Sequence, residues 1–236
     1  MSHDWVRLIV SDTHLGTVHS KEKKLLALLK EVEFDELILA GDILEFLRTP
    51  IFSDTTLEIL NLINTKPIAS TVYIVGNHDD AFASFVGSGI ANVNFCKQYN
   101  FEYHGRSFRV EHGDQYDYGL VNWTYTISII SFFQNMIERV FNIDLTTWWA
   151  KRQIKKRKLK KIWDIIKWNE DADVFIMGHT HNPEVLIWVD KYEKIKTYIN
   201  SGDWIDNCTY VIVKDGQVRL RKFEPKPMSN STDTIP

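Results

Sequence analysis

The 236 residues of this chain include few cysteines, no long apolar run and no large excess of basic residues. It has two cysteines, Cys96 and Cys208, which lie far apart and outside any Cys-x-x-Cys pattern. This excludes a disulfide-rich scaffold and predicts free thiols in a reducing cytoplasm. No apolar run reaches the length of about 18 residues that a simple membrane-spanning helix needs. The net charge is only −3, so overall basicity does not indicate a nucleic-acid partner.

The remaining composition is that of an ordinary globular protein. With 44% hydrophobic and 25% charged residues, the chain can bury a large core. Its first residues, Met-Ser-His-Asp-Trp, lack the basic and apolar regions of a signal peptide, which again predicts a cytoplasmic protein. We expect a single domain over residues 1–224. The tail, residues 225–236, is rich in Ser, Thr, Asn and Pro and is predicted to be disordered.

Short apolar runs alternate with helical patterns along the first third of the chain. Apolar runs at 6–10, 37–40 and 71–75 predict buried strands. Helical spacing at 20–32 and 55–63 predicts the intervening helices, with Ser20 as the N-cap of the first. This order predicts parallel βαβ units. Further strands are predicted at 107–111, 174–177, 198–202, 209–213 and 218–223.

Five of these predicted strands end in residues that can bind a metal ion. Asp42 follows the run 37–40 and a glycine, so a parallel strand would deliver its carboxylate to the carboxyl edge of the sheet. The other strand ends supply Asp12 with His14, Asn77 with His78, His112, and His179 with His181. Each motif alone is typical of a surface turn. Together they predict one shared site of nitrogen and oxygen ligands.

The pattern changes over residues 118–168, where we expect an inserted pair of helices. An apolar and aromatic stretch is followed by a basic run, Lys151–Lys161, with eight Lys or Arg in eleven positions. One interpretation is a solvated basic face packed against its own apolar partner. Another is a cap that contacts an anionic amphiphile or a membrane surface. Nucleic acid is a third possible partner, because basic and aromatic residues also mix in its binding sites.

The ligand-bearing motifs resemble those of a known family. Asp-x-His, Gly-Asp-x-x-Glu, Gly-Asn-His-Asp, His-Gly-Asp and Gly-His-Thr-His occur in the order found in calcineurin-like metallophosphoesterases, and the likeness spans residues 6–213. The resemblance implies an α/β (α+β) fold of four layers, a β-sandwich of two mixed sheets flanked by helices, with an inserted helical cap. It also implies two divalent ions, Mn²⁺ by family habit, although the same ligands would accept Fe, Co or Zn.

The resemblance further implies a role for each ligand. One ion would be held by Asp12, His14, Asp42 and His181. The other would be held by Asp42, Asn77, His112 and His179, so that Asp42 bridges the pair. Two cations neutralise phosphoryl oxygens and activate water for attack on phosphorus. His78 is expected to stabilise the transition state or protonate the leaving oxygen, and Asp79 to orient its ring. Substrate contacts are expected from Asp114, Trp149, Lys155 and Lys158.

Within the family, the chain is most similar to UDP-2,3-diacylglucosamine pyrophosphatases and their broader relatives. The relatives share Gly-Asp-Trp-x-x-x-Cys-Thr, found here at 202–209. The well-defined enzymes have Arg in place of His78, and an acidic and cysteine pattern in place of Gln115-Tyr116-Asp117-Tyr118.

The sequence therefore leaves three alternative functions open. The first is hydrolysis of UDP-2,3-diacylglucosamine or a similar nucleotide-diphosphate lipid, with peripheral contact at the inner face of the membrane. The second is a phosphodiesterase or nuclease acting on nucleotides or nucleic acid. The third is a non-catalytic scaffold. The oligomeric state stays open.

Overall fold

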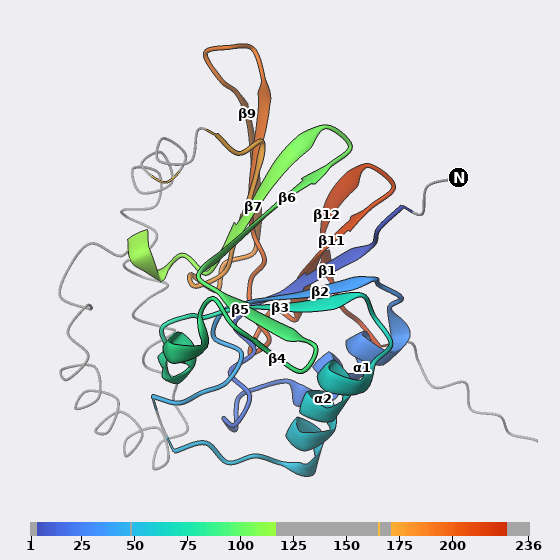
Figure 1. Ribbon diagram of the computed structural model, residues 1–236, viewed down its shortest axis with the longest axis vertical. Coiled ribbons are helices and arrows are strands. Elements are labelled where there is room, and N and C mark those ends of the chain that lie inside the picture. Colours follow the sequence, from blue (N-terminus) through green and yellow to red (C-terminus); the bar gives the residue numbers. More distant parts are fainter. Residues whose placement is uncertain (1–3, 48, 117–164, 166–170, 226–236) are drawn as a thin grey trace, which may run out of the picture.

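A seven-stranded mixed sheet is built from the first five and the last two described strands of the chain. The computed structural model describes residues 4–47, 49–116, 165 and 171–225 (Figure 1). The strand order is β12-β11-β1-β2-β3-β5-β4, and β1, β2, β3 and β5 run parallel. The bounds are β1 Arg7–Val10, β2 Glu36–Ala40, β3 Ser70–Ile74, β4 Gly89–Ile90, β5 Val93–Cys96, β11 Thr209–Lys214 and β12 Gln217–Lys222.

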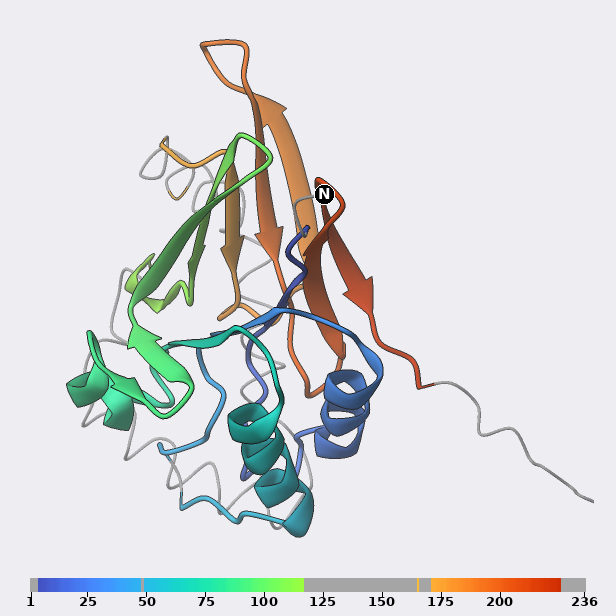
Figure 2. The same cartoon turned by 45° about the vertical axis from the view of Figure 1, so that its right-hand side comes forward.

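A five-stranded mixed sheet faces the first. Its order is β6-β7-β8-β10-β9, with β7, β8 and β10 parallel and the two outer pairs antiparallel. Figure 2 shows the two sheets splayed apart at one end, where the β9–β10 hairpin extends beyond the other strands. The bounds are β6 Gln98–Tyr103, β7 Arg106–Glu111, β8 Val174–Met177, β9 Glu184–Val189 and β10 Ile195–Asn200.

The period-2 alternation of the strands divides the core into layers. On β1, Ile9 belongs to the cluster between the two sheets, together with Val110 of β7 and Ile176 of β8. Its neighbours Leu8 and Val10 belong to the cluster beneath the helices. Both faces of the central strands are therefore buried, which explains why their sequences read as continuous apolar runs.

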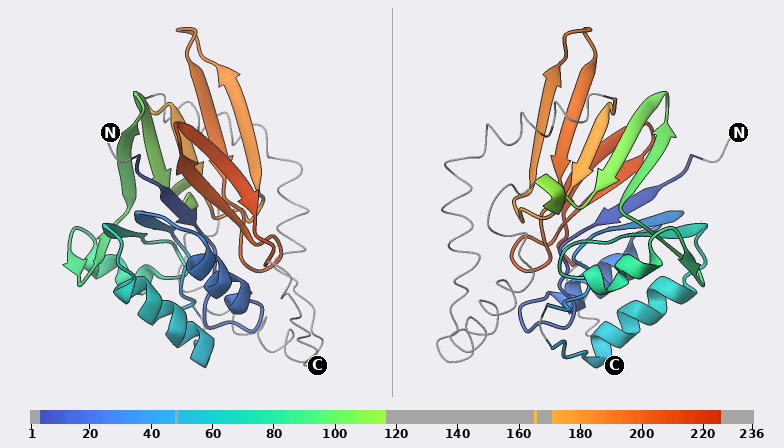
Figure 3. Two further views of the ribbon diagram at one scale, coloured as in Figure 1. Left: turned by 90° about the vertical axis from the view of Figure 1, so that its right-hand side faces the viewer. Right: turned by 60° about the vertical axis from the view of Figure 1, so that its left-hand side comes forward.

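Two helices cover the outer face of the seven-stranded sheet (Figure 3). They are α1, Glu22–Glu31, and α2, Asp54–Thr65. The N-cap of α2 is Ser53, whose hydroxyl accepts a hydrogen bond from the Thr56 N–H at 3.0 Å. The prediction that Ser20 caps the first helix is wrong. Its hydroxyl instead donates to the Thr13 carbonyl at 2.6 Å, and α1 begins without a side-chain cap.

The α/β fold with two mixed sheets is confirmed, and so are the strands predicted from apolar runs. Strands β4, β5, β6 and β9 were not predicted. On β6 and β9, buried or half-buried residues alternate with exposed ones, so no apolar run marks them. The helices α1 and α2 lie on the outer face of the seven-stranded sheet, whereas Tyr116 of the short 3₁₀ helix η2, Asp114–Tyr116, packs with Phe175 and Tyr198 of the five-stranded sheet. The predicted cap at 118–168 falls almost wholly outside the described residues, as does the tail from 226.

No helix in the described part of the chain is long and apolar enough to cross a membrane.

Candidate metal centre

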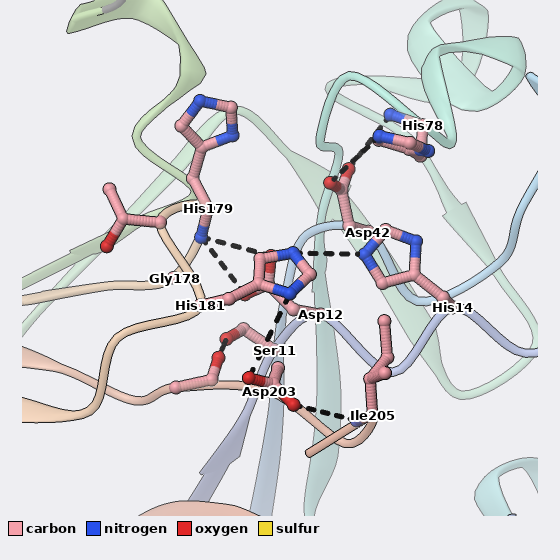
Figure 4. A network of polar contacts seen from close by, with 12 residues as sticks. Ser11, Asp12, His14, Asp42, His78, Gly178, His179, His181, Asp203 and Ile205 are labelled. Carbon is pink, nitrogen blue, oxygen red and sulfur yellow. Dashed lines mark hydrogen bonds and ion pairs between the residues drawn. The ribbon is translucent and has the colours of Figure 1, made fainter. Parts of the chain in front are cut away.

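The predicted ligands come together where the two sheets adjoin. Asp12, Asp42 and Asn77 follow β1, β2 and β3 of the larger sheet, whereas His112 and His179 follow β7 and β8 of the smaller one. Parallel strands bring their carboxyl ends to one edge, so side chains distant in sequence become neighbours. Figure 4 shows Asp12, Asp42 and His179 from close by, together with His14 and His181.

The first cluster consists of Asp12, His14 and His181. Their ligand atoms all lie within 4.8 Å of one another. The Nε2 atoms of His14 and His181 are 3.3 Å apart, and His181 Nε2 lies 3.3 Å from Asp12 Oδ1. Asp12 and His14 are buried. Two imidazole nitrogens directed at each other and at a carboxylate are the arrangement that a shared cation requires.

The second cluster consists of Asp42, His112 and His179, whose ligand atoms also lie within 4.8 Å of one another. His112 Nε2 is 3.1 Å from Asp42 Oδ2 and 3.3 Å from the amide oxygen of Asn77. The predicted ligand Asn77 therefore borders this cluster. Asp42 also acts through its charge on His14 of the first cluster. Its role as the bridge between two ions stays a prediction.

The donor set of both clusters fits divalent transition metals. Each combines a buried carboxylate with two imidazoles, and the second adds a neutral amide oxygen. Mixed nitrogen and oxygen ligation accepts Mn, Fe, Co or Zn and does not select among them. The clusters are therefore consistent with a dinuclear centre whose metal is not identified.

The buried carboxylates make both clusters attractive to positive charge. Burial alone would raise the pKa of Asp42, but the charges of His112 and His78 outweigh it and hold that pKa well below its usual value. Burial alone would lower the pKa of His112, but Asp42 raises it to about 10. In the same way Asp12 outweighs burial and raises the pKa of His181 to about 9. Binding of a cation would displace the protons held here.

The backbone is strained where the ligands leave their strands. Five of the seven predicted ligands have a positive φ angle, a conformation uncommon for residues other than glycine. Such strain persists only where the surrounding structure imposes it, and it clusters at functional sites. The five are Asp12 (51°), His14 (44°), Asp42 (55°), His179 (63°) and His181 (54°).

Two glycines allow the strand ends to approach the ligands closely. A Cβ added to Gly178 would overlap the Asp12 carboxylate and the Ser11 hydroxyl, and one added to Gly76 would overlap Asp42. Neither glycine has a positive φ, so the requirement is for space and not for backbone freedom. This explains why glycine precedes the ligands at these two strand ends.

We expect the Gly178→Ala variant to lose cation affinity at the first cluster. The new methyl group would displace Asp12, and disturbing a ligand's support typically costs about 10- to 100-fold in metal affinity. Calorimetric titration with Mn²⁺ would measure this. Gly89→Ala in the exposed strand β4 is the control, since its nearest neighbour is the side chain of Asn94. Unchanged Mn²⁺ affinity in Gly178→Ala would contradict the steric argument.

His78 lies at the edge of both clusters and is partly exposed, with 28% of its side chain accessible. Its backbone N–H donates to Asp42 Oδ1 at 2.8 Å, and its Nε2 is 3.9 Å from Asp42 Oδ2. The pKa of His78 is raised, because the Asp42 charge and the Glu45 hydrogen bond outweigh its burial. A histidine with a raised pKa beside two clusters of this kind can serve as a proton donor.

Glu45 contacts two histidines of the site and was not among the predicted site residues. Its Oε2 lies 2.7 Å from His78 Nδ1 and 3.2 Å from His14 Nδ1, so one carboxylate contacts both rings. These hydrogen bonds outweigh burial and lower the pKa of Glu45 to about 2. The signal was present in the motif Gly-Asp-x-x-Glu, where Glu45 stands three residues after Asp42.

The expectation that Asp79 orients the His78 ring is wrong. Asp79 is fully buried, and its carboxylate contacts Tyr73 of β3. Its carboxylate accepts hydrogen bonds from the Tyr73 hydroxyl at 2.7 Å, the Ile43 N–H at 2.8 Å and the Gly76 N–H at 2.6 Å. Asp79 therefore holds together the turns after β2 and β3 and does not contact the imidazole.

We expect Asp79→Ala to destabilise the fold by about 3 kcal/mol or more. It would leave two buried N–H groups and the Tyr73 hydroxyl without their acceptor, at about 1–3 kcal/mol each. Tyr73→Phe, which removes one of these hydrogen bonds, should cost only about 1 kcal/mol. Urea unfolding of the metal-free protein would compare the two. Equal stability of both variants would contradict a structural role for Asp79.

Of the four residues predicted to contact the substrate, the structure describes one, Asp114. Asp114 begins the short 3₁₀ helix η2, Asp114–Tyr116, two residues after His112, and its charge contributes to the raised pKa of that histidine. Trp149, Lys155 and Lys158 lie outside the described residues. All four stay predictions as substrate-binding residues.

The fold and the two clusters together define a metallophosphoesterase. The family described as calcineurin-like phosphoesterase matches residues 7–183, a range that contains all seven predicted ligands. The chain therefore belongs to the calcineurin-like phosphoesterase family, and it is a metal-dependent phosphoester hydrolase. The seven ligand assignments themselves rest on the geometry above and stay proposals.

Several solved structures are similar to this chain at low sequence identity. The phosphoesterase YfcE from Escherichia coli has 13% identity and a TM-score of 0.48, covering 92% of each chain. An archaeal phosphodiesterase has 16% identity and a TM-score of 0.45, covering 92% of this chain and 99% of that one. Vacuolar Protein Sorting 29 from Cryptosporidium parvum has 15% identity and a TM-score of 0.45, covering 92% and 96%. No curated protein matches the sequence.

Proposed function

We propose that this phosphoesterase hydrolyses a phosphoester or pyrophosphate bond with two divalent cations held by the two clusters. The observation that carries the proposal is their juxtaposition: two sets of nitrogen and oxygen ligands lie side by side, linked by the His179 N–H that donates to the Asp12 carboxylate, with His78 at their edge. Asp12, His14 and His181 would hold one cation, with Asp42 shared. Asp42, Asn77, His112 and His179 would hold the other. When bound, the cations neutralise phosphoryl charge and activate water.

The chain's own residues would then handle the proton. His78, whose pKa is raised because Asp42 and Glu45 outweigh its burial, would stabilise charge on the phosphoryl group or protonate the leaving oxygen. Glu45 holds the Nδ1 side of that ring, which leaves Nε2 for the reacting group. No serine or cysteine nucleophile is needed.

We further propose an amphiphilic substrate, such as UDP-2,3-diacylglucosamine or a similar nucleotide-diphosphate lipid. Beside the first cluster, the loop after β2 lies on the loop after β1, where the Ile51 N–H donates to the Gly16 carbonyl at 3.0 Å. Val18, Ile51 and Phe52 are exposed on these loops. Apolar side chains of this kind suit the acyl part of such a substrate. The basic run Lys151–Lys161 would suit its phosphates.

Neutralising several of the lysines between Lys155 and Lys161 should spare small generic esters and harm the true substrate. A nitrophenyl phosphate needs only the metal centre, whereas a large anionic substrate would also lose its contacts with the basic run. The measurement is kcat/KM for both substrates in the same variant. Equal loss on both would indicate that the run is structural.

A substrate panel with Mn²⁺ present tests the proposed function. It would contain UDP-2,3-diacylglucosamine, cyclic and linear nucleotides, single-stranded DNA, a phosphoprotein and nitrophenyl phosphate. Turnover of the UDP-lipid well above all the others is the expected result. Preference for DNA, with binding that weakens steeply as salt rises, would favour the nuclease alternative that the basic run also suits. Absence of metal-dependent turnover on every member would overturn the proposal.

A further inference from the structure

Three of the predicted histidine ligands share one feature on the side facing away from the clusters. The Nδ1 of His14 faces Glu45 at 3.2 Å, and the Nδ1 of His112 faces the Ala40 carbonyl at 3.1 Å. The Nδ1 of His181 faces Asp203 Oδ2 at 3.9 Å, which is an ion-pair distance longer than a hydrogen bond. In each case Nε2 faces the ligand cluster, so the oxygen on the Nδ1 side would select the tautomer that can bind a metal.

Asp203 is held rigidly in a turn between β10 and β11. Its Oδ1 accepts hydrogen bonds from three successive backbone N–H groups, those of Ile205 at 2.8 Å, Asp206 at 2.6 Å and Asn207 at 3.2 Å. The side chain is buried, with only 2% of it exposed. The other carboxylate oxygen, Oδ2, is therefore directed in a defined way toward His181 (Figure 4).

The same turn is hydrogen-bonded to the backbone of two residues of the first cluster, Asp12 and His181. The Trp204 N–H donates to the Asp12 carbonyl at 3.0 Å. The Asn207 side-chain amide donates to the His181 carbonyl at 3.0 Å and to Asp203 Oδ2. These hydrogen bonds connect the turn to the first cluster, so we expect its influence to fall there.

We propose that Asp203 is a positioning residue that orients the His181 ring and so tunes cation binding at the first cluster. The proposal rests on the assignment of Asp12, His14 and His181 as ligands. A carboxylate behind a metal-binding imidazole fixes the ring and raises its basicity, and losing such a partner typically costs about 10- to 100-fold in metal affinity.

The test compares two charge-removing variants of the same turn by calorimetric titration of the full chain with Mn²⁺. Asp203→Asn keeps an oxygen for the three N–H groups but presents an amide donor to His181. Asp206→Asn removes a neighbouring exposed charge and is the control. We expect wild type and Asp206→Asn to bind two ions alike. Asp203→Asn should retain one site at wild-type affinity and bind at the other about 10- to 100-fold more weakly.

Thermal unfolding of the metal-free variants separates positioning from structural damage. If Asp203→Asn weakens both sites equally together with a lower melting temperature, the residue only supports the turn and the proposal is overturned. Two sites of wild-type affinity in Asp203→Asn would overturn it as well, while leaving the proposed function intact. If the wild-type chain binds no Mn²⁺, the ligand assignment fails together with this inference.

Discussion

Asp42→Ala should lose both cations and nearly all phosphoesterase activity. Asp42 is buried, lies 3.1 Å from His112 Nε2, and accepts a hydrogen bond from the His78 backbone. If it bridges the two ions, no other predicted ligand replaces it, since every other one serves a single cluster. Loss of the several kcal/mol that metal ions contribute to the transition state corresponds to about 10³-fold in rate.

Metal content after dialysis and turnover of nitrophenyl phosphate would both be measured for Asp42→Ala. Asp80→Ala is a matched control, because it removes an exposed carboxylate that follows Asp79 and pairs with the surface residue Lys97. Circular dichroism of the metal-free variant checks that it is folded. Retention of one tightly bound ion would show that Asp42 serves only the second cluster and would reject the bridge.

His78→Ala should retain both cations and lose most of its turnover. The ring is not among the predicted ligands and is held by Glu45 at the edge of the clusters. Loss of a proton donor of this kind typically lowers the rate by about 10²- to 10⁴-fold. If His78 protonates the leaving oxygen, the loss should be much larger for an alkyl phosphate than for a nitrophenyl ester, whose leaving group needs little protonation.

One outcome would contradict the catalytic role of His78, and a second would decide between charge stabilisation and protonation of the leaving oxygen. Metal content that falls in parallel with activity would make His78 a ligand, as its membership of a third potential cluster with His14 and Glu45 allows. An equal loss on alkyl and nitrophenyl esters would instead assign it to stabilising phosphoryl charge. Glu45→Gln is the informative companion variant, since it disturbs the partner of His78 without removing the imidazole.

The strand ends that carry the ligands could be predicted from the sequence, because a buried strand has a strong local signature. Apolar runs followed by Gly and a polar residue marked β2, β3 and β8, and the parallel arrangement implied a common edge. Strands such as β6 and β9 could not be predicted in this way. Their alternating exposure depends on which face the rest of the chain covers.

The sequence by itself determined which residues are available as ligands, since Asp12, Asp42 and the histidines stand in local motifs whose chemistry needs no tertiary contact to recognise. Only the tertiary structure decided which side chain supports which. Asp79 is adjacent to His78 yet turns into the core, whereas Glu45 and Asp203, 33 and 22 residues from their histidines, lie beside the rings. The physical reason is that side-chain direction at these strand ends depends on strained backbone angles and on donors from other strands, which local sequence does not specify.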